Sequence, residues 1–89
     1  MKTTYLKTTP KEKINSPSYY KVIKEPGHLT SISVWNSRSL DCYTDEFIEL
    51  EDYITLLSQS MGKAEEIEKS VFDEQYILLS KKLNRLINA

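Results

Sequence analysis

Hydrophobic and polar residues alternate along residues 19–35, on both sides of Pro26-Gly27. A period of two is typical of strands, and Pro-Gly supplies the two central residues of a type II turn. This segment therefore predicts a β-hairpin, with Tyr19 and Tyr20 on opposite faces of its first strand. A third strand is expected to begin at Leu40 and to end somewhere within 44–50.

After the third strand the hydrophobic spacing changes from two to alternating three and four, which is typical of an amphipathic helix. The helix could begin after Thr44 as N-cap, or near Glu51 with 47–50 as a strand, and the later start is favoured. Gly62 either ends this helix or lies inside a longer one. The stripe that defines the helix consists of Phe47, Leu50, Ile54, Leu57 and Met61.

Helical spacing resumes beyond Gly62 and predicts a helix to about residue 87. Its apolar positions begin with Ala64, Ile67 and Val71. The stripe that follows is read as core or as the seam of a homodimer. It comprises Phe72, Tyr76, Leu79, Leu83 and Leu86.

We therefore expect a single α+β domain over residues 1–89, with a small antiparallel β-meander followed by one long or two shorter amphipathic helices. Residues 1–18 form a basic segment, either a flexible arm or a short strand at Thr3–Thr8. Residues 19–50 are β-rich and residues 51–89 are helical.

Composition narrows the class of protein. A chain of 89 residues forms a small core, and oligomerisation is one way to enlarge it, so a homodimer is expected. Cys42 is the sole cysteine, which precludes an internal disulfide and favours a reducing, cytoplasmic setting. No signal peptide is visible and no apolar run approaches the length of a membrane span, so no membrane association is expected.

The sequence shows no constellation of residues that fixes a chemistry. His28 and Cys42 are the only residues of their types, and a nucleophilic pair with Asp41 or Asp45 is a weaker interpretation than a solvated histidine and a small buried cysteine. Neither metal-ligand spacing nor a glycine-rich phosphate loop is present. We expect a non-enzymatic protein without a cofactor.

Charge is distributed unevenly along the chain. Residues 1–40 hold seven basic and two acidic residues, a net of +5, whereas residues 41–89 hold five basic and eleven acidic residues, a net of −6. Such asymmetry suggests charged partners. Mutual neutralisation of the two halves within the fold is the competing explanation.

The first functional hypothesis uses the acidic half. Carboxylates spaced along a helix can dock on a basic protein surface or imitate a phosphate backbone. The chain would then be a small regulator or inhibitor of a host or cognate protein, for example one that handles nucleic acid. Phages and mobile elements encode regulators of this kind. The candidate contacts are Asp45, Glu46, Glu49, Glu51, Asp52, Glu65, Glu66, Glu68, Asp73 and Glu74.

The alternative hypothesis uses the basic half. Lysines and arginine would contact phosphates, and aromatic rings on the sheet would stack on bases, as in a dimeric or single-strand-binding nucleic-acid regulator. The candidate residues are Lys2, Lys7, Lys11, Lys13, Tyr19, Tyr20, Lys21, Lys24, Trp35 and Arg38.

Residues 47–57, Phe-Ile-Glu-Leu-Glu-Asp-Tyr-Ile-Thr-Leu-Leu, resemble the strand-to-helix segment of the Phd/YefM antitoxins. The resemblance implies a dimer that binds DNA with its N-terminal part and a toxin with an acidic C-terminal segment. It covers 11 of the 89 residues. The strand and Ala-Arg-containing helix that open those antitoxins are absent from residues 1–18, so the likeness is local.

Overall fold

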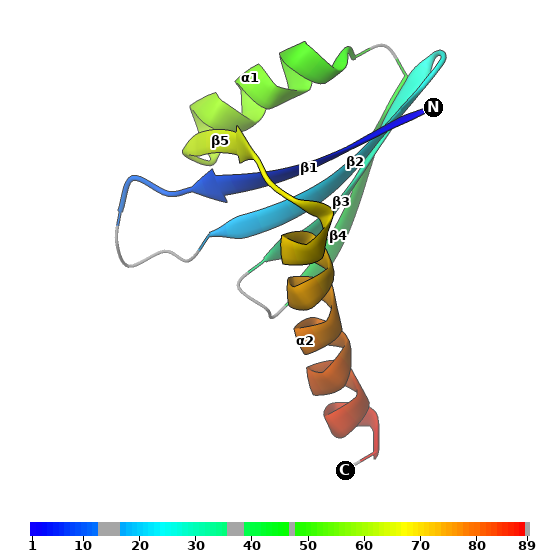
Figure 1. Ribbon diagram of the computed structural model, residues 1–89, viewed down its shortest axis with the longest axis vertical. Helices are drawn as coiled ribbons and strands as arrows, with labels where there is room; N and C mark the ends of the chain where they lie inside the picture. Colours follow the sequence, from blue (N-terminus) through cyan, green and yellow to red (C-terminus); the bar gives the residue numbers. More distant parts are fainter. Residues whose placement is uncertain (13–16, 36–38, 47, 89) are drawn as a thin grey trace.

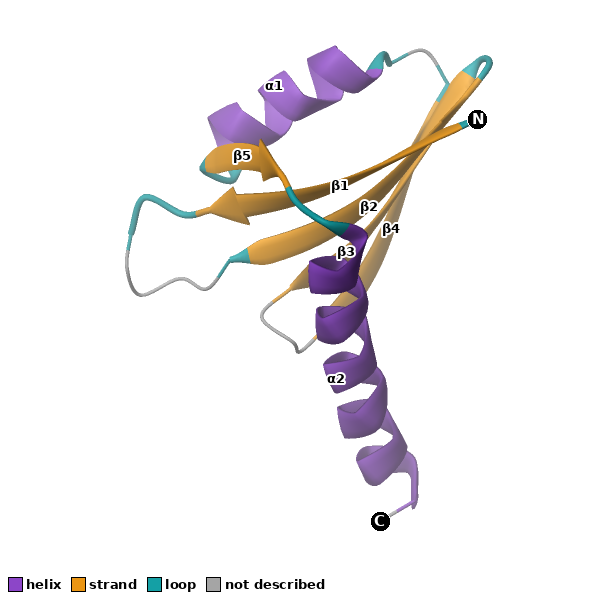
Figure 2. Ribbon diagram, viewed as in Figure 1, coloured by secondary structure: helices purple, strands orange, loops and turns teal. Residues whose placement is uncertain are grey.

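The computed structural model describes residues 1–12, 17–35, 39–46 and 48–88, without the side chains of 86–88. It has the expected α+β architecture, with a five-stranded antiparallel sheet and two helices, shown in Figure 1 and Figure 2. In chain order the elements are β1 (Lys2–Thr9), β2 (Ser18–Glu25), β3 (His28–Trp35), β4 (Ser39–Asp45), α1 (Leu50–Ser60), β5 (Lys63–Glu66) and α2 (Lys69–Asn88).

The sheet has the strand order β4-β3-β2-β1-β5. Strands β1 to β4 form a meander, and β5 returns to pair with the free side of β1. The predicted hairpin is β2–β3, and Gly27 in its turn has φ +88, a conformation that glycine adopts without strain. The third predicted strand is β4.

One face of the sheet, here called the α1 face, packs against α1. Leu6, Tyr20, Val22 and Leu29 meet the helix, and all four are buried. The helix contributes Tyr53 and Leu57, with Leu50, Ile54 and Met61 packed around them. The part of the expected helical stripe that the structure describes, from Leu50 to Met61, is therefore the side of α1 that packs on the sheet, with Tyr53 added.

The opposite face, here called the α2 face, packs against the first half of α2. Phe72 and Leu79 are buried with Val34, and Tyr5, Tyr19 and Ile32 of the sheet surround them. In Figure 1 the helix crosses the sheet steeply and its C-terminal half extends past the strands. Beyond Leu79 the described side chains of the helix, apart from half-buried Ser80, are exposed.

The segment around Gly62 differs from the helical expectation. Gly62 ends α1, as one alternative predicted, with φ +104 and with the Thr9 carbonyl group in the space that a Cβ would need. The expectation that Ala64 and Ile67 belong to a helix is wrong. Ala64 lies in β5, and the Ile67 N–H donates to the Tyr5 carbonyl oxygen at 2.9 Å, so pairing with β1 overrides the helical spacing.

Two further boundaries can be compared with the expectations. Residues 2–9 form a strand between β2 and β5 rather than a flexible arm. Helix α1 begins at Leu50, one residue before the favoured start, with Glu49 as N-cap in place of Thr44. Ile48 and Glu49 are not in a strand, and Phe47 lies outside the described residues.

Candidate protein-docking surface

The ten acidic residues singled out in the sequence lie in two groups rather than on one face. Asp45, Glu46, Glu49, Glu51 and Asp52 surround the N-terminal end of α1, whereas the other five lie on β5, on the connection that follows it and on the first turns of α2. The sequence places all ten in one stretch, but Gly62 and β5 intervene and separate them in space. Each group must therefore be judged alone.

The first group is stabilised by the helix that carries it. Glu51 and Asp52 lie in the first turn of α1, where unpaired backbone N–H groups favour negative charge. Glu49, the N-cap, has its Oε1 3.7 Å from the Nζ of Lys24. Among the residues that the structure describes, Glu46, Glu51 and Asp52 form no ion pair, and all three side chains are exposed to solvent.

The outward side of α1 also carries an exposed apolar residue. Leu56 is 49 % exposed, and it lies one turn after Asp52 and outside the buried stripe. The hydroxyls of Thr55 and Ser60 donate to the carbonyl oxygens of Glu51 and Leu56, at 3.0 and 2.8 Å, so they are occupied within the helix. What the helix offers a partner is a leucine with carboxylates on the N-terminal side. We call Glu46, Glu51, Asp52 and Leu56 the α1 surface.

The second acidic group is partly offset within the chain. Glu65 lies opposite Lys7 in the register of β5 and β1. Asp73 accepts a hydrogen bond from the Nζ of Lys69 at 2.7 Å, and this bond raises the pKa of Lys69 above 10.5. Glu66, Glu68 and Glu74 are exposed. This group therefore forms a mixed surface, in contrast to the α1 surface.

The residues proposed for nucleic-acid binding do not share one surface. The register places Lys7 and Lys21 on the α2 face, both half-buried, and Lys2 and Lys24 on the α1 face. Lys11 is exposed in the connection after β1, and Lys13 and Arg38 lie outside the described residues.

The proposed stacking platforms are also occupied by packing. Tyr20 is buried in the core under α1, and its hydroxyl lies 3.2 Å from the Oγ1 of Thr8. Tyr19 packs around the core under α2. Trp35 is half-buried at the end of β3. These rings support the fold, and in the described part of the chain no row of exposed aromatics follows a line of lysines.

The predicted dimer seam is divided by the fold. Phe72 and Leu79 are 3 % and 2 % exposed and belong to the core of their own chain. Tyr76 and Leu83 are each 43 % exposed, and the Leu86 side chain is not described. Within the stripe, Phe72 and Leu79 are therefore core, whereas Tyr76 and Leu83 are exposed.

His28 and Cys42 lie apart. Cys42 is opposite Ile32 on β3, four strand positions from His28, which corresponds to about 13 Å. Asp41 and Asp45 project from the face of β4 opposite to Cys42, and the Nε2 of His28 lies 3.6 Å from Glu25. The structure thus does not bring together the nucleophilic pair considered above.

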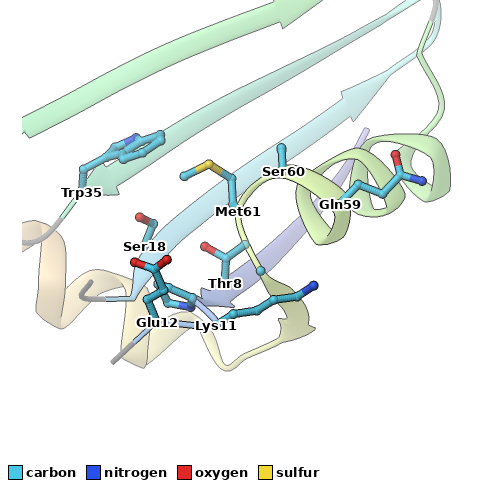
Figure 3. A pocket seen from close by; sticks show the side chains of 10 residues that line it. Thr8, Lys11, Glu12, Ser18, Trp35, Gln59, Ser60 and Met61 are labelled. Atoms are coloured by element: carbon cyan, nitrogen blue, oxygen red, sulfur yellow. The ribbon is translucent and has the colours of Figure 1, made fainter. Parts of the chain in front are cut away.

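A trough that no sequence pattern indicated lies between the C-terminal end of α1 and the sheet. It comprises two adjoining cavities of about 430 and 370 Å³ that share Trp35, Ser60 and Met61. Figure 3 shows Trp35 and Met61 on opposite sides of the first cavity, with Thr8 and Ser18 between them. The Nε1 of Trp35 is buried without a hydrogen-bond partner in the described part of the chain.

No protein-family model, no curated protein and no solved structure matches this chain. Among the described residues no group of three or more His, Cys, Asp and Glu is placed to hold a metal ion. None of the described helices is both long enough and apolar enough to cross a membrane. The function is therefore inferred from the charge and exposure of the protein's own surfaces.

Proposed function

We propose that this protein is a non-enzymatic regulator or inhibitor that docks on a basic surface of a partner protein through the α1 surface. The observation that carries the proposal is that Asp52 lies one turn before the exposed Leu56 on α1, with Glu51 in the same first turn and the exposed Glu46 in the connection that precedes the helix. Charged groups around an apolar anchor give both fast association and affinity, because the charges steer the encounter and the leucine is buried on contact.

The chemistry of the partner follows from this surface. It would offer lysines or arginines around an apolar cavity that accepts a leucine, as in helix-in-groove recognition. A positively charged groove is typical of proteins that handle nucleic acid, and a row of carboxylates can occupy it as a mimic of the phosphate backbone. A cytoplasmic host or cognate protein of this kind is the partner that we propose, with the chain acting as a phage or mobile-element product does.

The test is capture by the tagged full-length protein, with the α1 surface altered. The variant Glu51→Lys/Asp52→Lys/Leu56→Ala is compared with the control Glu65→Lys/Glu66→Lys/Glu68→Lys, whose charge change is larger but lies on the second acidic group. We expect the first variant to lose the captured partner and the control to keep it. Capture should also weaken with salt and with added duplex DNA.

The results that oppose the proposal are equally specific. Equal capture by wild type and the α1 variant would refute docking through α1, and loss only in the control would move the site to the second group. Stepwise elution from heparin, with a shift of DNA or RNA at low salt, would favour the nucleic-acid alternative. We also propose that the protein is a homodimer, for which sedimentation at several concentrations is the measurement.

A further inference from the structure

We infer that two copies of this chain join along β4, antiparallel, to form one continuous ten-stranded sheet with Cys42 at the two-fold axis. The inference rests on the homodimer proposed above and places its interface. It concerns the edge of the sheet and not the seam on α2 that helical spacing predicted.

The two edges of the sheet are built differently. Strand β5 has four residues, Lys63-Ala64-Glu65-Glu66, and three of them carry charge. Short, charged edge strands resist pairing with another chain. Strand β4 has seven residues, Ser39–Asp45, without lysine, proline or glycine, and six of the seven are exposed. Among the described residues, no strand pairs with the outer side of β4, which presents a row of backbone groups.

The exposed side chains of β4 also favour burial. Leu40 and Tyr43 are 46 % and 41 % exposed, and Cys42 is exposed on the α2 face between Leu40 and Thr44. Helix α2 lies against β1, β2 and β3, so it leaves this end of its face uncovered. Pairing with a second β4 would satisfy the backbone and place these side chains beside those of the partner.

Among the registers that pair at least about five residues of each β4 strand, charge selects one. Consider two antiparallel β4 strands related by a two-fold axis perpendicular to the sheet. The α1 face of one copy then continues into the α1 face of the other, and one residue lies at the axis, directly opposite its own copy. If the axis were at Asp41, the two copies of Asp41 would lie opposite each other. If the axis were at Tyr43, Asp41 of each copy would lie opposite Asp45 of the other. Like charges directly opposite each other destabilise a sheet.

The axis at Cys42 avoids both conflicts and uses the full strand. Asp41 then lies opposite Tyr43 of the second copy, Leu40 opposite Thr44, and Ser39 opposite Asp45. All seven residues pair, because Cys42 is the middle residue of Ser39–Asp45. The register with the longest overlap is thus also the one without a like-charge pair, and this coincidence points to a second copy as the occupant.

The proposed arrangement places the two copies of Cys42 directly opposite each other, and this short distance can be measured. Opposite residues of an antiparallel pair have Cα atoms about 4.5–5.5 Å apart, within the range of about 4.4–6.8 Å that a disulfide spans. Mild oxidation with copper phenanthroline should therefore link two chains rapidly, with the oxidant accepting two electrons as the two thiols lose their protons. This cross-link is a probe of distance and no part of the proposed interface.

The register can be tested with paired cysteines in a Cys42→Ser background. Leu40→Cys alone should link slowly, since its two copies would be about 14 Å apart along the strands. Thr44→Cys alone should behave in the same way, whereas a mixture of the two proteins should link as rapidly as wild type. All three positions are exposed, so these changes leave the core of the chain intact.

Two lysine substitutions, one at the axis and one away from it, form a matched pair of variants. Cys42→Lys places two lysines opposite each other and should raise the dissociation constant of the dimer about fivefold or more. Thr44→Lys places its lysine opposite Leu40 and should change the constant much less. A monomer at every concentration would overturn the homodimer and this interface together. A dimer that links through Leu83→Cys but not through Cys42 would overturn the β4 interface alone, and neither result bears on docking through α1.

Discussion

Tyr43 of β4 and Tyr53 of α1 stack with ring centroids 5.6 Å apart and planes inclined by 9°. The hydroxyl of Tyr43 donates to the Oδ2 of Asp45 at 2.9 Å, which fixes the ring along its own strand. This stack joins the edge strand directly to the helix that carries the α1 surface. The β4 edge and the proposed docking helix are therefore in direct contact through this pair of rings.

The stack should appear as a coupling energy in a double-mutant cycle. Aromatic pairs contribute about 0.5–1.5 kcal/mol beyond the area that they bury. We expect Tyr43→Leu and Tyr53→Leu, measured singly and together by urea unfolding, to be non-additive by about that amount. As a control, Tyr43→Leu combined with Tyr5→Leu on the α2 face should be additive. Additivity in the first cycle would show that the stack adds nothing beyond burial.

Alkaline pH should destabilise the fold through Tyr53. Burial raises the pKa of Tyr53 above 10.0, so the folded state holds a proton that the unfolded state releases. The stability that this group contributes is fully present below the unfolded pKa and is lost as pH rises through the folded pKa. The variant Tyr53→Phe has no phenolic proton to lose. We therefore expect the free energy of unfolding of wild type to fall relative to that of Tyr53→Phe as the pH rises above about 10, compared with their difference at pH 7.

A second tyrosine tests whether this effect is specific. The hydrogen bond to Asp45 raises the pKa of Tyr43, with burial and the Asp45 charge acting in the same direction. Tyr43→Phe should therefore also reduce the loss of folding stability at alkaline pH. The double variant Tyr43→Phe/Tyr53→Phe should reduce that loss most. Parallel stability curves for wild type and all three variants between pH 8 and 11 would contradict this assignment.

Much of the fold follows from local pattern, and the exceptions have identifiable causes. The hairpin and both helices were predictable because alternation, Pro26-Gly27 and the helical stripes all act locally. Strand β5 was not, since Lys-Ala-Glu-Glu has no β-forming residue, and only its backbone pairing with β1 makes it a strand. The difference between buried Leu79 and exposed Leu83 likewise depends on where the sheet ends beneath α2 (Figure 1).

The acidic residues of the candidate surface could be identified from the sequence, but their positions relative to one another in the fold could not. The sequence identifies the acidic half, but whether Glu51 and Glu65 share a surface depends on the turn at Gly62. Leu56 was missed because only its position outside the buried stripe distinguishes it from Leu57. The available signal was a leucine one turn after Asp52, on the polar side of the predicted helix.

The turn at Gly62 should tolerate no side chain. Its φ of +104 is unfavourable for other residues, and an added Cβ would overlap the Thr9 carbonyl group. We expect Gly62→Ala to cost more than the about 1–2 kcal/mol of a left-handed conformation alone. Gly27→Ala is the matched control, with φ +88 and nothing within 4 Å of its Cβ. Equal losses in thermal unfolding would show that conformation, and not contact with Thr9, governs both positions.

Adjacent leucines on α2 should differ sharply in their contribution to stability. Leu79 is 2 % exposed against the sheet, whereas Leu78 is 44 % exposed. Leu79→Ala leaves a cavity between α2 and Val34, and such substitutions cost about 2–5 kcal/mol. Leu78→Ala should change the free energy of unfolding of the monomer by about 0.5 kcal/mol or less. Because the two variants remove the same atoms one position apart, a comparable loss in both would mean that α2 also packs through Leu78, either by a different rotation on the sheet or against a second chain. Repeating the measurement over a range of protein concentrations separates these two explanations, since only a contact between chains makes the loss depend on concentration.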